Sequence, residues 1–117
     1  MLFVAQIICL FLELHHTLSD RELRRVAFKL DKEEWSQLGT FLGLVESELV
    51  SIGSLNMGAQ EKAFRVACMW RSRCKMGRSQ MVSQLAVALE EIHRKDTAQF
   101  VIEQFLEGKG RKKFFGW

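Results

Sequence analysis

The stretch 60-QEKAFRVACMWRSRCKMG-77 decides the fold of this chain of 117 residues. Its apolar side chains recur every three to four residues, the interval that places them on one face of an α-helix. The residues of this apolar stripe are Ala63, Phe64, Val66, Ala67, Trp70 and Cys74. Most charged residues of the stretch fall outside the stripe. The pattern therefore predicts a central helix on which the segments before and after it pack.

The composition favours helices throughout the chain. Proline is absent, β-branched residues are few, and leucine, alanine, glutamate, lysine, arginine and glutamine are common, all of them good helix formers. A chain of this length makes one domain that buries most of its apolar surface without disulfide or metal. We therefore expect an all-α domain of about six short helices. The expected structural core is Trp35, Leu38, Leu42, Ala63, Ala67, Trp70, Leu85 and Leu89.

Capping patterns mark the first two helices. Ser19 and Glu22 have the S-x-x-E spacing in which the two side chains satisfy each other's backbone N–H groups at a helix start. Asp31 and Glu34 repeat this spacing and predict that a second helix opens there. Gly43 is a suitable end for the second helix because glycine readily adopts the left-handed conformation.

Similar signals predict the remaining helices. A third helix over 44–52 leads into a glycine-containing loop. Gly77 is expected to close the central helix, and Ser79 to cap a fifth. Asp96 is expected to cap a sixth helix, which Gly108 ends.

The two ends of the chain differ in composition from the middle. The apolar run 1–14 has neither the charged start nor the cleavage site of a secretory signal, and it is too short to span about 30 Å of hydrocarbon. A buried or interfacial helix docked on the domain is expected there, with a remnant of a longer protein as the alternative. The predicted organisation is an N-terminal segment 1–18, a domain 19–107 and a basic, aromatic, flexible tail 108–117.

The cysteines and histidines show no spacing typical of a metal site, such as CxxC or HxxxH. These residues are Cys9, His15, His16, Cys68, Cys74 and His93. Three cysteines cannot all pair within one chain, so reduced thiols in a cytosolic protein are expected. The sequence therefore predicts no metal, no cofactor and a cytoplasmic location.

Charge alternates in sign along the chain although the net charge is only +3. The segments 19–29, 61–80 and 108–117 are basic, whereas 30–60 and 81–107 are acidic. Blocks of this kind predict opposed patches on one molecular surface.

Enzyme motifs are missing from the sequence. It contains no G-x-S-x-G, no H-E-x-x-H and no Walker pattern, and its carboxylates are expected on exposed helix faces. An enzyme, and with it a small-molecule substrate, is therefore not expected. The alternative to a protein-binding domain is a small helical protein that binds nucleic acid or a membrane surface through its tail, which mixes cations with aromatic rings. These residues are Lys109, Arg111, Lys112, Lys113, Phe114, Phe115 and Trp117.

Taken together, the helical segments resemble the death domain family over residues 18–106. The motifs are LSDRELRRVAFKL, KEEWSQLGTFLGL, ESELVSI, EKAFRVACMW and SQMVSQLAVALEEIHRKDTAQFV, with two tryptophans expected to be buried, Trp35 and Trp70. These tryptophans favour a death domain over a caspase-recruitment or death-effector domain. Val45 departs from the pattern, because the family often has a serine or threonine cap there. The resemblance implies a six-helix antiparallel Greek-key bundle without an active site.

The resemblance also implies a mode of binding. A basic surface of the first and fourth helices meets an acidic surface of a neighbouring death domain, which is either another copy or another protein of apoptotic or inflammatory signalling. The expected basic patch is Arg21, Arg24, Arg25 and Arg65, and the expected acidic patch is Glu33, Glu34, Glu46 and Glu48. A second expected pair of patches is Arg71, Arg73, Lys75 and Arg78 with Glu90, Glu91 and Asp96. Since the two surfaces of a pair differ, such contacts are head-to-tail.

Overall fold

The computed structural model describes residues 17–106 of the chain. These residues form six α-helices and no strand. The helices are α2 (Asp20–Ala27), α3 (Glu34–Phe41), α4 (Glu46–Gly53), α5 (Ala59–Arg73), α6 (Arg78–Glu91) and α7 (Lys95–Val101), followed by a π-helical turn, η1 (Ile102–Leu106). The all-α class and the six helices are thus confirmed. The predicted N-terminal helix over 1–14, the end of the sixth helix at Gly108 and the tail over 108–117 lie outside the described residues.

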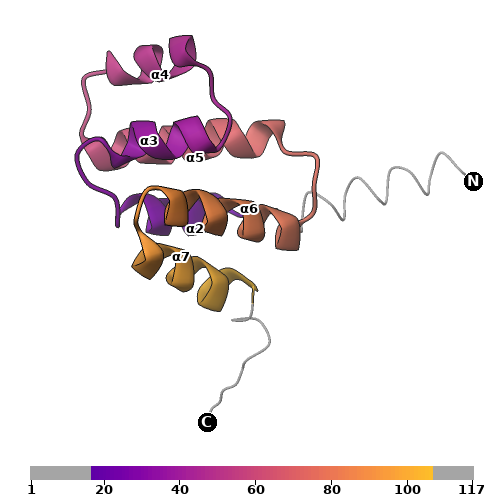
Figure 1. Ribbon diagram of the computed structural model, residues 1–117. Helices are drawn as coiled ribbons and strands as arrows, with labels where there is room; N and C mark the ends of the chain where they lie inside the picture. Colours follow the sequence, from indigo (N-terminus) through magenta and orange to yellow (C-terminus); the bar gives the residue numbers. More distant parts are fainter. Residues whose placement is uncertain (1–16, 107–117) are drawn as a thin grey trace, which may run out of the picture.

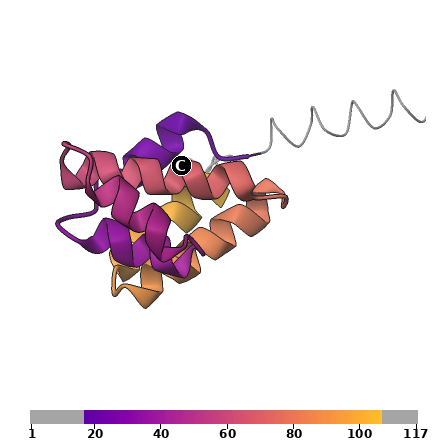
Figure 2. The same cartoon turned by 90° about the horizontal axis from the view of Figure 1, so that it is seen from above.

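Helix α5 is the centre of the bundle, as its apolar stripe predicts. It packs against α2, α3 and α4, while α6 packs against α7, η1 and α3. Figure 1 shows α4 at the top, α3 and α5 below it, then α2 and α6, and α7 at the bottom. Figure 2 shows α2 along one side of α5 and α3 on the other. Helices far apart in sequence therefore share one core.

All but one of the residues expected in the core are buried. Buried side chains from every helix meet in a single cluster, and Trp70 is only 3% exposed within it. Leu38, Leu42, Ala63, Ala67, Leu85 and Leu89 are buried as expected. Trp35 is the exception, because it is only half-buried and packs at the edge of the core. Its ring lies beside Gly53, and the Lys62 ammonium sits 5.4 Å from the ring centroid.

The first helix begins as the capping pattern predicts. The Ser19 Oγ accepts a hydrogen bond from the Glu22 N–H at 3.2 Å, and the Glu22 Oε1 accepts one from the Ser19 N–H at 2.9 Å. At the second helix the prediction is wrong by two residues: the N-cap is Glu33 and not Asp31, and α3 starts at Glu34. Glu34 does reach back to the Asp31 N–H at 2.8 Å, but Lys32 adopts a φ of +47° and interrupts helical geometry between them.

Three predicted caps need correction. Helix α5 ends at Arg73, since Cys74 is extended, so Gly77 does not close it. Gly77 is instead the N-cap of α6, and Ser79 lies inside that helix. Arg94 is the N-cap of α7, and Asp96 lies in its first turn. Gly43 follows α3 with a φ of +95°, which confirms its predicted left-handed conformation.

One buried polar group gives a stability prediction. Thr97 is fully buried in α7, and its Oγ1 has no hydrogen-bond partner among the described residues. A buried hydroxyl without a partner costs about 1–3 kcal/mol, and valine has nearly the same shape without the hydroxyl. We expect Thr97→Val to raise the free energy of unfolding by about 1 kcal/mol, which raises the Tm by roughly 4–8 °C in a domain of this size. Thermal unfolding followed by circular dichroism measures the change.

Thr97→Ser is the matched control, because it keeps the hydroxyl and removes a buried methyl group. It should lower the Tm. A Thr97→Val protein that melts at or below the wild-type temperature would show that the Thr97 hydroxyl is satisfied in solution.

Candidate interaction surfaces

Two consecutive arginines of helix α2, Arg24 and Arg25, contact different neighbouring helices. Arg24 turns toward α5, where its Nη1 lies 2.9 Å from the Glu61 carboxylate and its guanidinium stacks 3.8 Å from the Phe64 ring centroid. Arg25 turns toward α7, and its guanidinium lies 5.0 Å from the centroid of the Phe100 ring. Consecutive positions on a helix are about 100° apart, which explains the division. The expected basic patch is therefore spread over two sides of α2.

Three of the four residues in the expected basic patch make no ion pair within residues 17–106. They are Arg21, Arg25 and Arg65, and all three are exposed. Arg65 lies on α5 beside a shallow groove of about 760 Å³, whose apolar lining includes Phe64 and Met69. These cations can therefore contact a partner without first breaking an ion pair.

The expected acidic patch is also divided between free and paired carboxylates. Glu33 and Glu46 are exposed and form no ion pair with another described residue. Together with Glu34 they line an open groove of about 1130 Å³ between α3 and α4. Glu34 is paired with Arg94 of the α6–α7 turn at 2.7 Å, and Glu48 is paired with Arg73 of α5.

Hydrogen bonds from arginines of the same chain keep the Glu48 and Glu61 carboxylates ionised. The Arg73 guanidinium and the Val45 backbone N–H lower the pKa of the Glu48 carboxyl to about 2. A bond from Arg24 likewise lowers the pKa of Glu61 below its usual value. Both groups carry full negative charge at neutral pH, and that charge is directed to arginines of the same chain. The bond from the Val45 N–H to Glu48, 3.0 Å long, is the half of a capping box that needs no serine or threonine, and the Glu48 N–H donates to the Val45 carbonyl at 3.0 Å where such a side chain would accept.

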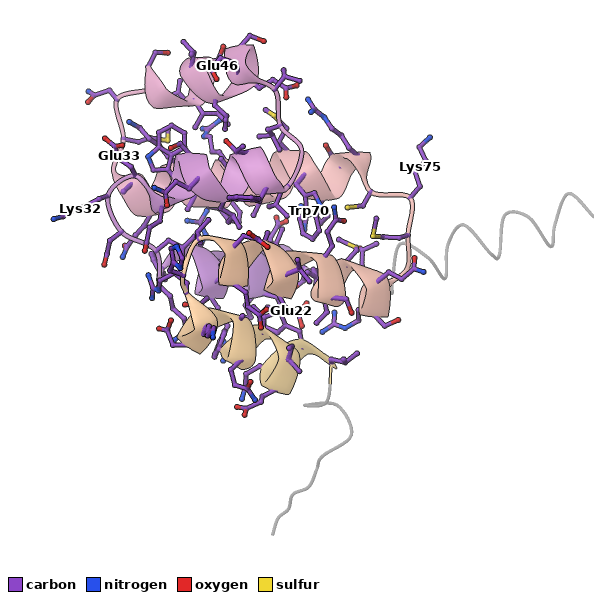
Figure 3. The ribbon with its side chains drawn as sticks, in the orientation of Figure 1. Glu22, Lys32, Glu33, Glu46, Trp70 and Lys75 are labelled. Atoms are coloured by element: carbon purple, nitrogen blue, oxygen red, sulfur yellow. The ribbon has the colours of Figure 1, made fainter. Side chains whose placement is uncertain are left out.

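Most residues of the second basic patch form ion pairs with carboxylates of the same chain. Arg71 pairs with Asp20 of α2 at 2.5 Å, and Arg78 pairs with Glu22 of α2, also at 2.5 Å. Lys75 is exposed and makes no ion pair with another described residue. Figure 3 shows Lys75 at the opposite end of the bundle from Lys32 and Glu33.

The acidic members of that second pair lie near the turn between α6 and α7. Glu90 and Glu91 are exposed at the end of α6 and have no ion pair within residues 17–106. Asp96 is bound by Arg94 at 3.1 Å, and this contact lowers the pKa of its carboxyl. Arg94 thus joins two carboxylates, a role that the sequence did not indicate. The proximity of Arg94 and Asp96, two residues apart, was the one sequence feature that could have predicted the Arg94–Asp96 pair.

The remaining candidate chemistry is sparse within residues 17–106. Burial raises the pKa of the Cys68 and Cys74 thiols, so neither is an activated nucleophile. No group of three or more histidine, cysteine, aspartate or glutamate side chains is placed there to hold a metal ion. None of the described helices is both long enough and apolar enough to cross a bilayer.

The death domain family model matches residues 20–105. The chain therefore belongs to the death domain family, as its helical motifs, six-helix fold and central tryptophan indicate. No curated protein and no solved structure matches it. Death domains are protein–protein interaction modules of signalling pathways. The predicted domain limits of 19–107 stay a prediction.

Proposed function

We propose that this death domain assembles cytoplasmic signalling complexes, in apoptosis or inflammation, by binding a death domain of another copy or of another protein. One observation supports the proposal above the others: exposed charges of both signs have no ion-pair partner in the part of the chain that the structure describes. The exposed basic residues are Arg21 and Arg25 on α2 and Arg65 on α5, and the acidic surface holds Glu33 and Glu46. Two surfaces of opposite sign on one molecule favour head-to-tail contact with a neighbour.

Three other residues of the expected patches, Arg24, Glu34 and Glu48, form ion pairs within the chain, so their role differs from that of the unpaired residues. Arg24, Glu34 and Glu48 already hold partners, so a neighbour would have to compete with Glu61, Arg94 or Arg73 for them. We therefore assign these three residues to shaping the surfaces. Exposed ion pairs contribute only about 0–1 kcal/mol each, so the free charges set partner choice and encounter rate more than affinity. In the second pair of patches, the residues without an ion-pair partner within 17–106 are Lys75, Glu90 and Glu91, so we propose the first pair as the main contact.

The proposal predicts that charge reversal on α2 weakens partner binding and leaves the fold intact. Arg25 is exposed, and its only described contact is with the Phe100 ring, which Lys29 also covers at 4.3 Å. Arg25→Glu should therefore change the free energy of unfolding by less than about 1 kcal/mol. Against an acidic death-domain surface it replaces attraction with repulsion, and we expect binding to weaken by roughly tenfold or more. Capture of death-domain partners on the immobilised protein, followed by titration, measures the affinity.

Lys95→Glu is the matched control, because Lys95 is also exposed and forms no ion pair with a described residue, but it lies on α7. It should bind partners like the wild type. Unchanged binding of Arg25→Glu, or equal losses in the two variants, would remove the basic surface from the proposal. A charge-exchanged partner that restores the binding of Arg25→Glu would identify the opposing carboxylate.

A further inference from the structure

A groove of about 760 Å³ runs along helix α5 between α4 and α2. The α5 side chains that line it recur every three to four residues, so they form one stripe of the helix. Figure 1 shows α4 on one side of α5 and α2 on the other. Arg24 of α2 forms one wall, and the end of α4 with Leu55 forms the other. The stripe itself is Glu61, Phe64, Arg65, Cys68, Met69 and Ser72.

The lining of this groove is largely apolar and is not fully covered by the chain. Leu55 is 36% exposed, and Phe64, Cys68 and Met69 of α5 are half-buried at the edge of the core. Covering such side chains with another apolar surface is favourable by about 25 cal/mol for each Å² removed from water. The groove therefore favours an occupant with apolar side chains.

Cations surround the floor of the groove. The Arg24 guanidinium lies 3.8 Å from the Phe64 ring centroid, and the Arg71 Nη2 lies 4.0 Å from the Cys68 Sγ. Burial raises the pKa of the Cys68 thiol, and the positive charges of these two arginines and of Arg65 act against it. Arg24 and Arg71 are paired with carboxylates of the same chain, whereas Arg65 is exposed and makes no ion pair within residues 17–106. The groove therefore keeps an unpaired positive charge, which complements an acidic occupant.

The shape of the groove suits a helix. The α5 stripe from position 61 to 72 is about 17 Å long, or about three helical turns. An extended peptide gains affinity from main-chain hydrogen bonds to a free sheet edge, and residues 17–106 contain no strand. A small molecule needs a pocket that buries most of its surface, which a shallow groove does not provide. An amphipathic helix instead lays its apolar side chains, spaced three to four residues apart, into such a groove.

We infer that this groove binds an acidic amphipathic helix of a partner protein. The apolar face of that helix covers Phe64, Met69 and Leu55, and a carboxylate along its edge pairs with Arg65. The site is separate from the proposed contact through Arg25, which lies on the α7 side of α2 and does not line the groove. The chain can therefore hold a helical segment of a second protein while Arg25 contacts a death domain.

Titration of a fluorescent helical peptide with the full chain, followed by fluorescence anisotropy, tests the inference. The probe is a synthetic peptide of about 15 residues with leucines on one face and glutamates on both edges, and the control probe has lysine in place of every glutamate. We expect the lysine probe to bind at least about tenfold more weakly than the acidic probe. Leu55→Glu should weaken binding of the acidic probe about tenfold or more, because it removes apolar area and adds a like charge. Arg65→Gln should weaken it up to about fivefold, the value of an exposed ion pair.

Val87→Glu is the matched control, because Val87 is an exposed apolar residue of α6 that does not line the groove. Val87→Glu and Arg25→Glu should both bind the acidic probe within about twofold of the wild type. Since Arg25→Glu should lose only its death-domain partner, the groove and the proposed function can fail separately. Alkylation followed by mass spectrometry locates the probe: it should slow the reaction of the Cys68 thiol in the groove but not that of Cys74. Circular dichroism verifies that each variant keeps its helices.

Other results would overturn the inference. Absence of binding of the acidic probe would exclude the helix, and equal binding of the two probes would exclude recognition by charge. Equal losses in Leu55→Glu and Val87→Glu, or unchanged alkylation of Cys68, would place the probe outside the groove. Self-association of the chain that Leu55→Glu abolishes, without binding of the probe, would assign the groove to a second copy of the chain.

Discussion

Trp70→Ala is expected to lower the free energy of unfolding by about 3–5 kcal/mol, the usual cost of truncating a large buried side chain. Trp70 lies on the central helix α5 and is 3% exposed. Its indole N–H donates to the Gln84 Oε1 of α6 at 3.3 Å, so truncation also removes the partner of a part-buried amide. Domains of this size are stable by only about 5–15 kcal/mol. We therefore expect the variant to lose a large share of its stability and its urea midpoint to fall well below that of the wild type.

Urea denaturation followed by far-ultraviolet circular dichroism measures this loss, with Trp35→Ala as the matched control. Trp35 is the same residue type, but it is half-buried and rests against Gly53 and Lys62. Its truncation should cost less, about 1–2 kcal/mol. A Trp70→Ala protein that melts cooperatively at the wild-type midpoint would place Trp70 outside the core. Equal losses for the two tryptophans would contradict the burial that separates them.

Local signals were sufficient to predict much of the fold. The apolar periodicity of α5 and the Ser19–Glu22 spacing depend only on residues within two helical turns, and both predictions are confirmed. The caps of α6 and α7 were predicted wrongly because a serine or aspartate also fits the first turn of a helix, where Ser79 and Asp96 are found. The observed N-caps, Gly77 and Arg94, make no side-chain cap hydrogen bond, so the capping preference of serine and aspartate pointed to the wrong residues.

The candidate surfaces were less predictable, because a charged residue reveals its partner only once the helices are packed. Glu22 and Arg78 are 56 positions apart, and Glu34 and Arg94 are 60 positions apart. No periodicity links residues at such separations. The alternating charge blocks predicted contacts between opposite charges. They did not show which of these contacts form within the chain and which form between two chains. The tertiary structure distinguishes the two cases for neighbouring residues: Arg24 is paired with Glu61 of the same chain, whereas Arg25 makes no ion pair with another described residue.

The Glu22–Arg78 pair gives the second large expected effect. Both side chains are 21% exposed, and the guanidinium also binds the carbonyls of Thr17 and Phe105. Arg78→Met keeps the aliphatic part of the side chain but leaves a half-buried carboxylate and two carbonyls without their donor. Breaking a buried pair costs about 3–5 kcal/mol, and partial exposure reduces this, so we expect a loss of about 2–3 kcal/mol at pH 7. Urea denaturation measures the loss, and a double-mutant cycle with Glu22→Gln isolates the pair.

The same pair predicts how the loss depends on pH. Burial raises the pKa of the Glu22 carboxyl, but hydrogen bonds from Arg78 and Ser19 outweigh burial and hold this pKa below its usual value. A carboxyl whose pKa is lower in the folded chain stabilises the fold above the unfolded pKa of about 4.3, and this contribution disappears as the pH falls through the folded pKa. The difference in stability between the wild type and Arg78→Met should therefore shrink as the pH is lowered from 7 toward about 3. Glu48 titrates in both proteins and cancels in the comparison, so a constant difference would show that Glu22 does not depend on Arg78 for its charge.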